Sequence, residues 1–294
     1  MARVLVLKAA GINCDEETVH AFRLAGAEVE LVDAGALLRG ESRLEDFDVF
    51  VVPGGFSYGD DLGAGTVLAN RLRSRLRAEI EAFVDAGRLV LGICNGFQVL
   101  VRFGLLPGWG GEKQVSLIES TRGCFEDRWV TLGVESSASP FLTETVARGG
   151  ILRVPIAHAE GRLVARDPAV VERLRANGQI ALTYRRREAD AGGRHALAGG
   201  VWPDNPNGSL ADIAGISNER GNVLGLMPHP ERFVHRLQDP LWTRSVLASR
   251  DAADLERAGD GFAIFASAVG FVDGAASANR GGAALARDRG PEFA

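Results

Sequence analysis

Lysine is almost absent from this chain: only Lys8 and Lys113 occur among its 294 residues. Neither lies in the Gly-x-x-x-x-Gly-Lys-[Ser/Thr] loop that binds nucleotide phosphates, so no ATP-dependent step is assigned to this chain. Arginine supplies the other positive charges, most densely in residues 71–77, where a helical pattern predicts a solvated or partner-facing stripe. Because a nucleic-acid-binding surface needs a basic face, a chain with a net charge of −5 is not expected to bind nucleic acid.

Cysteine is also scarce. The three cysteines, Cys14, Cys94 and Cys124, are odd in number and widely spaced, a pattern that fits neither a disulfide framework nor a metal site. Free thiols suit a reducing compartment, so we expect a cytoplasmic protein, with Cys14 as a packed thiol. No signal peptide opens the chain and no apolar run is long enough to cross a bilayer, so we expect no membrane association.

The first 104 residues alternate short apolar strands with helical patterns. We expect strands at Arg3–Leu7, Glu28–Val32, Val49–Val52 and Leu89–Gly92, and helices at Asp15–Ala25, Ala64–Ala86 and Asn95–Phe103. This alternation predicts an α/β fold with an open, mostly parallel, flavodoxin-like sheet flanked by helices. Further along, strand-like stretches are separated by turns alone, which predicts an antiparallel extension. These stretches are Val115–Ile118, Trp129–Val134, Ile151–Ile156 and Ile180–Tyr184, before Val223–Leu226 returns to the central sheet.

Length and composition define the domain organisation. With 294 residues, of which 46% are hydrophobic, the chain can bury a substantial core. We expect one domain over residues 1–270. The remaining residues, 271–294, are rich in Gly, Ala and Arg and lack apolar periodicity, so they are predicted to form a disordered C-terminal tail.

The segment 92–96 (Gly-Ile-Cys-Asn-Gly) follows a buried strand and opens a helical pattern. It matches the cysteine form of the nucleophile elbow, in which a sharp strand-to-helix turn exposes the reactive side chain. The two glycines let strand and helix backbones approach closely. At the start of a helix, unpaired N–H groups and the positive dipole end favour a thiolate. Taken alone, the motif leaves a buried, inert Cys94 as an alternative.

The segment 227–231 (Met-Pro-His-Pro-Glu) follows another apolar strand. The two prolines keep it extended, so His229 and Glu231 project to the same side. Glu231 can then bond one ring nitrogen of His229 while the other nitrogen faces a thiol. A turn histidine between prolines is the simpler interpretation of His229 alone, but its pairing with the cysteine elbow favours a Cys-His-Glu catalytic set.

A Gly-Gly pair follows the strand Val49–Val52, in the segment Gly54–Asp60. Such a pair can turn a backbone N–H into a cleft as an oxyanion hole requires, although an ordinary turn has the same composition. Gly55, Cys94 and His229 each come just after a predicted parallel strand. Ligands bind beyond the carboxyl ends of such strands, so the three are expected to share one crevice.

These residues resemble the triad glutamine amidotransferases. Six further strings resemble, more specifically, the glutaminase subunit of phosphoribosylformylglycinamidine synthase, an enzyme of de novo purine synthesis. They are Gly11–Asp15, Gly54–Asp60, Cys94–Gln98, His158–Arg162, Asn205–Ser209 and Pro228–Arg232. The similarity extends from Arg3 to about Val269, which identifies residues 1–270 as a type 1 glutamine amidotransferase domain.

The resemblance implies a role for each motif residue. Cys94 would attack the carboxamide of glutamine, and the N–H groups of Gly55 and Asn95 would stabilise the oxyanion. His229 would protonate the departing ammonia and then activate water, with Glu231 orienting the ring.

Other residues are assigned less directly by the same resemblance. Gln98 matches a position that helps to hold the substrate glutamine, although a surface glutamine is an equal alternative. Ser57 and Tyr58 are weaker glutamine-binding candidates. His158 and Glu160 are expected in an interface loop rather than in catalysis.

The resemblance also implies partners. Ammonia would pass through a tunnel to a larger synthetase subunit, which binds ATP with Mg and formylglycinamide ribonucleotide, and a small third subunit would bridge the two. No cofactor or metal is expected in this chain. Two alternatives stay open at this point: a stand-alone cysteine hydrolase of the same fold, such as a γ-glutamyl hydrolase or peptidase, and a non-catalytic regulatory module.

Overall fold

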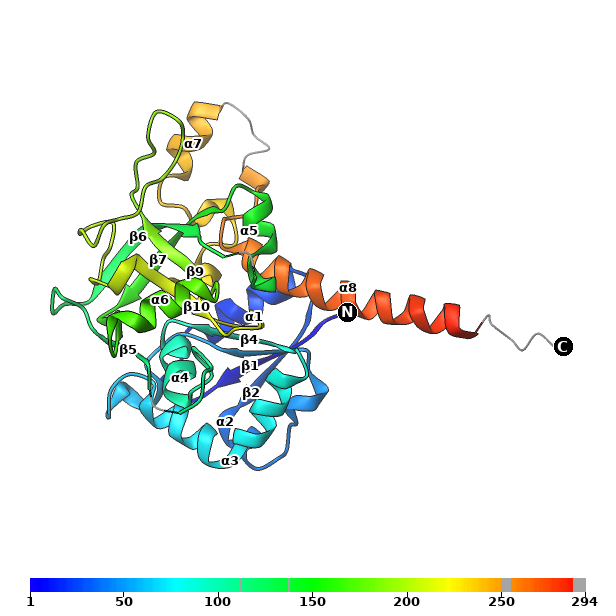
Figure 1. Ribbon diagram of the computed structural model, residues 1–294. Helices are drawn as coiled ribbons and strands as arrows, with labels where there is room; N and C mark the ends of the chain where they lie inside the picture. The colour runs from blue at the N-terminus through cyan, green and yellow to red at the C-terminus, as the bar shows by residue number, and fades with distance from the viewer. Residues whose placement is uncertain (112, 137, 250–254, 288–294) are drawn as a thin grey trace.

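The computed structural model describes residues 1–111, 113–136, 138–249 and 255–287. Its main feature is a nine-stranded sheet with the order β2-β1-β3-β4-β11-β10-β9-β6-β7, accompanied by a two-stranded sheet of β5 and β8. Figure 1 shows α3 below the parallel strands and α1 and α8 above them, so helices cover both faces of that half of the sheet.

One half of the sheet is parallel. Its strands are β1 (Arg3–Lys8), β2 (Glu28–Asp33), β3 (Val49–Val52), β4 (Leu89–Ile93) and β11 (Val223–Leu226). All pairings among them are parallel. Every residue of β3 and β4 is buried, because strands with helices on both faces are apolar throughout rather than alternating. The predicted parallel sheet is confirmed.

The other half is antiparallel. It consists of β10 (Ile213–Ser217), β9 (Ile180–Arg185), β6 (Glu126–Val134) and β7 (Ile151–His158), and β5 (Val115–Glu119) pairs with β8 (Glu160–Ala165) in the smaller sheet. Strand β11 is parallel to β4 and antiparallel to β10, so it joins the two halves. The predicted antiparallel extension is confirmed, and β8 and β10 are additional strands that the sequence patterns did not indicate.

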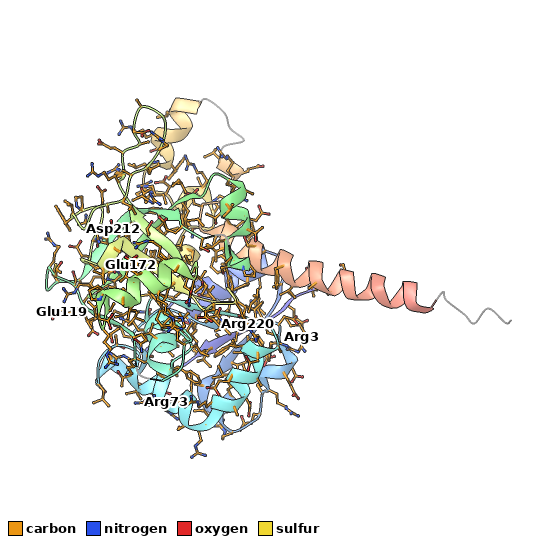
Figure 2. All side chains as sticks on the ribbon, in the orientation of Figure 1. Arg3, Arg73, Glu119, Glu172, Asp212 and Arg220 are labelled. Atoms are coloured by element: carbon orange, nitrogen blue, oxygen red, sulfur yellow. The ribbon has the colours of Figure 1, made fainter. Side chains whose placement is uncertain are left out.

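Eight α-helices lie in the described part of the chain. They are α1 (Asp15–Leu24), α2 (Ala34–Leu38), α3 (Thr66–Asp85), α4 (Asn95–Phe103), α5 (Thr143–Ala147), α6 (Pro168–Ala176), α7 (Trp242–Ser249) and α8 (Phe262–Arg287). In α3 buried side chains recur every four residues, at Leu68, Leu72, Leu76 and Ile80. The arginines between them are exposed (Arg73 in Figure 2), as expected for a solvated stripe. None of the described helices is long and apolar enough to cross a membrane.

Helix α8 crosses the predicted domain boundary, and the disordered tail stays a prediction. It continues to Arg287 and extends away from the body of the protein, so the predicted boundary at residue 270 falls inside it. Its first turns are anchored, since Phe265 is buried and packs edge-to-face on Phe22 with ring centroids 5.0 Å apart. Once packing has nucleated a helix, an alanine-rich continuation propagates it readily. Residues 288–294 of the predicted tail lie outside the described residues.

Candidate active site

Cys94 occupies the sharp turn between β4 and α4 that the sequence predicts. Its φ is +50° and its ψ −106°, a conformation that residues other than glycine seldom adopt and that clusters at functional sites. The Cys94 N–H donates to the Leu226 carbonyl at 2.8 Å, which ties the turn to the end of β11. A side chain at residue 96 would overlap the Val52 carbonyl oxygen, so glycine there lets α4 begin this close to β3.

His229 and Glu231 form a buried pair just beyond β11. Each residue is 1% exposed, and His229 Nδ1 and Glu231 Oε1 are 2.5 Å apart. The backbone N–H of His229 donates to the Pro155 carbonyl at 2.8 Å, which holds the segment against β7. Because the carboxylate accepts from Nδ1–H, the remaining ring nitrogen, Nε2, is the one left for the reaction.

Two opposing effects set the pKa of His229. Burial lowers it, but the Glu231 carboxylate, followed by the Cys94 and Cys14 sulfurs, raises the pKa of His229 well above its ordinary value of 6.5. This shift in pKa favours the protonated ring. A buried imidazolium beside a nucleophile is the proton donor that a departing amine requires.

The segment after β3 offers free backbone donors. Gly55 has a φ of +139°, and a Cβ there would lie 2.7 Å from both Asn13 N and the Gly11 carbonyl oxygen, so only glycine fits. The neighbouring Phe56 N–H donates to that same Gly11 carbonyl at 2.8 Å and fixes the loop. Among the described residues, no acceptor takes the N–H of Gly55 or of Asn95. Two such donors are what an oxyanion hole requires.

The three strand ends converge at Gly54. A Cβ at this residue would stand 2.7 Å from His229 Cε1, 3.3 Å from Cys14 Sγ and 3.4 Å from Cys94 Cβ. The absence of a side chain at residue 54 thus leaves room for the imidazole and the two cysteines. The predicted convergence of Gly55, Cys94 and His229 at one edge of the sheet is present in the structure.

Known proteins share this arrangement of sequence and fold. A family model described as a CobB/CobQ-like glutamine amidotransferase domain matches residues 1–272. Two relatives named phosphoribosylformylglycinamidine synthase subunit PurQ are similar over most of the chain. The one from Dehalococcoides mccartyi is 44% identical over 91% of this chain and 96% of its own length. The one from Treponema denticola is 43% identical over 79% of this chain and 88% of its own length.

A solved structure agrees with these relatives. One chain of the structure of PurLQS from Thermotoga maritima matches with a TM-score of 0.66 and 32% identity, covering 92% of this chain and 100% of that chain. This chain belongs to the PurQ family. The resemblance that the sequence motifs indicated is confirmed. The predicted glutamine amidotransferase fold is confirmed as well.

Cys14 lies closer to His229 than the sequence indicated, since it was expected to be a packed thiol only. Ligand atoms of Cys14, His229 and Glu231 lie within 4.8 Å of one another, the spacing of a candidate metal site. Two observations oppose a metal there. His229 Nδ1 is already bonded to Glu231, and the Arg232 guanidinium donates to Cys14 Sγ at 3.1 Å, so the sulfur already has a cationic partner.

The predicted glutamine-binding residues differ in their surroundings. Gln98 is buried rather than on the surface; its Oε1 accepts from Asn95 at 3.1 Å and its Nε2 donates to the Glu160 carbonyl at 2.6 Å. Ser57 is buried beside Asn95. Tyr58 instead contacts α3, where its hydroxyl accepts from Arg71 at 2.8 Å. A role of these three residues in holding glutamine remains a prediction.

His158 corrects the expectation of an interface loop. It ends β7, is 3% exposed and lies close to His229. Burial and the nearby charge of His229 lower the pKa of His158 to about 3, which favours the neutral form of this second histidine. Its place at the site depends on β7 meeting the end of β11, which no local pattern around residue 158 indicates.

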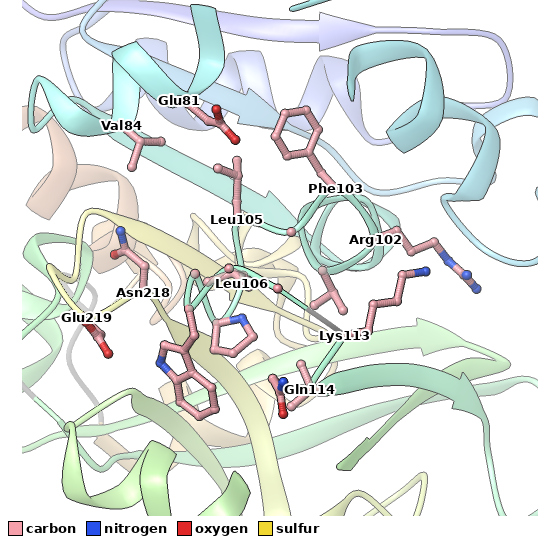
Figure 3. Close-up of a pocket in the computed structure, with 18 of the residues that line it drawn as sticks. Glu81, Val84, Arg102, Phe103, Leu105, Leu106, Lys113, Gln114, Asn218 and Glu219 are labelled. Carbon is pink, nitrogen blue, oxygen red and sulfur yellow. The ribbon is translucent and has the colours of Figure 1, made fainter. Parts of the chain in front are cut away.

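The pocket in Figure 3 is separate from the triad. It measures about 430 Å³ and lies between the ends of α3 and α4 and the loop that follows α4, with Leu105, Arg102 and Asn218 among its lining residues. Charges of both signs line it, and several are already paired; Arg77, for example, bonds Glu81 at 2.8 Å. The residues that line this pocket include none of Cys94, His229 and Glu231. The candidate site is therefore identified by the geometry at the strand ends and not by the volume of a pocket.

Replacing Glu231 with glutamine tests the cause of the His229 shift. The neutral carboxamide oxygen can still accept from Nδ1–H, but the charge that raises the pKa of His229 is lost. Protonated His229 persists below the folded-state pKa of its ring and is lost as pH rises through that pKa. The alkaline limb of the pH profile of glutaminase activity should therefore move down by about 1–3 pH units.

The turnover of Glu231→Gln at neutral pH should fall by about tenfold, less than the 10²–10⁴ expected when the acid–base group itself is removed. The measurement is kcat/KM against pH for both proteins. A variant with the parent's rate and an unshifted profile would show that Glu231 does not act on His229.

Proposed function

We propose that this chain is the glutaminase subunit of phosphoribosylformylglycinamidine synthase, which releases ammonia from L-glutamine for use by a synthetase partner. The observation that carries the proposal is the meeting of Cys94 in a strained elbow with the buried His229–Glu231 pair at one edge of the sheet. The relatives that match most of this chain carry that subunit's name.

The proposed reaction begins with attack of the Cys94 sulfur on the carboxamide carbon of glutamine. The carbonyl oxygen becomes an oxyanion that the N–H groups of Gly55 and Asn95 would stabilise. His229 donates a proton from Nε2, the C–N bond breaks and ammonia leaves, so a γ-glutamyl thioester remains on Cys94. His229 then takes a proton from water, which attacks the thioester and releases glutamate. The balance is one glutamine and one water converted to one glutamate and one ammonia.

The remaining assignments concern partners and location. We infer that ammonia passes to a large synthetase subunit bridged by a small third subunit, because released ammonia would be protonated in bulk water near neutral pH. ATP with Mg, and formylglycinamide ribonucleotide, belong on that synthetase, since this chain has no P-loop lysine. The complex is proposed to be cytoplasmic, in agreement with the three unpaired cysteines.

The test is a glutaminase assay of the purified chain, alone and with the synthetase and the small subunit. We expect the chain alone to hydrolyse glutamine slowly. In the complex supplied with ATP and formylglycinamide ribonucleotide, the rate of hydrolysis should increase greatly, with one formylglycinamidine ribonucleotide formed for each glutamine consumed. Full-rate cleavage of γ-glutamyl or peptide bonds by the chain alone would instead identify a stand-alone hydrolase. No hydrolysis in any combination would identify a non-catalytic module.

A further inference from the structure

The side chain of Asn95 joins the two parts of the proposed oxyanion hole. Asn95 follows Cys94 directly and is 1% exposed. Its Oδ1 accepts the backbone N–H of Ser57 at 3.2 Å, and its Nδ2 donates to Asp60 Oδ1 at 3.0 Å and to Gln98 Oε1 at 3.1 Å. One carboxamide therefore clamps the 54–60 loop to the first turn of α4.

Asp60 holds the other end of this clamp. Its φ of +54° is uncommon for a residue other than glycine, although aspartate and asparagine tolerate it better than most. Its Oδ1 accepts the Gly65 N–H at 3.2 Å as well as the Asn95 amide, and its carbonyl accepts the Gly63 N–H at 2.8 Å. Asp60 is thus fixed from both sides, by the turn that leads into α3 and by the residue after the nucleophile.

Strand β8 supports the same cluster. Glu160 Oε2 accepts the Ala64 N–H at 3.3 Å, its carbonyl accepts from Gln98, and Arg102 (Figure 3) donates to the Ala64 carbonyl at 2.7 Å. Burial, and to a lesser extent the Glu160 charge, raise the pKa of the Asp60 carboxyl, while the Gly65 and Asn95 donors and Arg102 oppose that rise. The Asp60 carboxyl group is therefore partly desolvated and is held in place by the Gly65 and Asn95 donors.

We propose that Asp60 is a positioning residue for glutamine hydrolysis, which acts through the Asn95 side chain to hold the N–H groups of Gly55 and Asn95 on one oxyanion. This inference rests on the proposed function and adds a residue that does not touch the reacting atoms. Because oxyanion stabilisation acts on the transition state, losing this alignment lowers kcat and leaves KM nearly unchanged.

The experiment compares two substitutions in the intact complex with its synthetase. Asp60→Gly permits the positive φ but removes the acceptor, so we expect kcat for glutamine to fall about 10²-fold, as for a misaligned catalytic geometry. Asp60→Asn keeps both the oxygen acceptor and tolerance of the backbone conformation, so it should remain within about threefold of the parent. Asp61→Asn, at the adjacent exposed aspartate, is the matched control and should behave as the parent.

A double-mutant cycle tests the route through Asn95. If Asp60 acts through that side chain, Asp60→Gly combined with Asn95→Ala loses no more kcat than Asn95→Ala alone. Ammonia-dependent synthesis by the same complexes reports folding and docking and should be unchanged. Three results with an active parent would overturn the inference. Asp60→Gly could keep the parent's kcat, it could raise KM in place of lowering kcat, or its full loss of kcat could add to that of Asn95→Ala. A parent without glutaminase activity overturns the proposed function instead.

Discussion

Replacing Cys94 with serine is expected to abolish glutamine-dependent synthesis by the reconstituted complex while leaving ammonia-dependent synthesis nearly intact. In the proposed mechanism the Cys94 sulfur takes part only in releasing ammonia, whereas amidation proceeds on the partner. Serine fits the elbow without a change in bulk, but its hydroxyl is a far weaker nucleophile than a cysteine thiolate. Both activities are measured as formation of formylglycinamidine ribonucleotide, with either glutamine or ammonium as the nitrogen source.

Cys124→Ser is the matched control for that experiment, because Cys124 is an exposed free cysteine whereas Cys94 is buried. It should retain both activities. Equal loss of both activities in a folded Cys94→Ser complex would assign the residue to structure or docking, and retention of both would exclude it as the nucleophile.

Replacing His229 with alanine is expected to lower glutaminase turnover by a factor of about 10² or more, since general acid–base assistance is typically worth 10²–10⁴. The substitution removes the proton donor for ammonia and leaves the buried Glu231 carboxylate without its partner. Its effect should therefore exceed that of Glu231→Gln, which keeps the ring in place. Initial rates of glutamate formation in the complex measure the loss.

An exposed histidine provides the comparison for His229→Ala. His20→Ala, on α1, should leave turnover unchanged. Ammonia-dependent synthesis again separates loss of chemistry from loss of folding, since it should persist in the His229→Ala complex. A turnover within a few-fold of the parent would remove His229 from the mechanism.

The parts of the site that the sequence predicts are those fixed by local pattern. Cys94 and the glycine at residue 96 follow a wholly apolar strand, and the prolines around His229 constrain it to an extended segment. The carboxyl ends of parallel strands lie at one edge of the sheet. Residues predicted to follow such strands, Cys94 and His229 among them, are therefore also predicted to lie near one another. Local sequence and tertiary structure agree there because the parallel half of the sheet is built from short, continuous apolar runs.

The residues that the sequence did not place come from contacts between distant segments. Cys14 reaches His229 because the segment after β1 packs against the end of β3, and His158 lies in the site because β7 runs beside the segment after β11. Strand β10 carries a glycine at its centre, Gly215, and lacks a continuous apolar run, so its pattern is weak. The start of helix α8 was not predicted from the sequence either, because it is held by a contact between distant segments, the packing of Phe265 on Phe22.

The central claim, that this chain delivers ammonia from glutamine to a partner without release into water, is tested most directly by isotope transfer. The complex is supplied with amide-¹⁵N-labelled glutamine in the presence of excess unlabelled ammonium, and the enrichment of the new amidine nitrogen in formylglycinamidine ribonucleotide is measured by mass spectrometry. The Cys94→Ser complex serves as the control that bulk ammonium can enter the product. We predict that the parent product retains the full enrichment of the glutamine amide. A product diluted to the enrichment of the bulk ammonium would contradict the account.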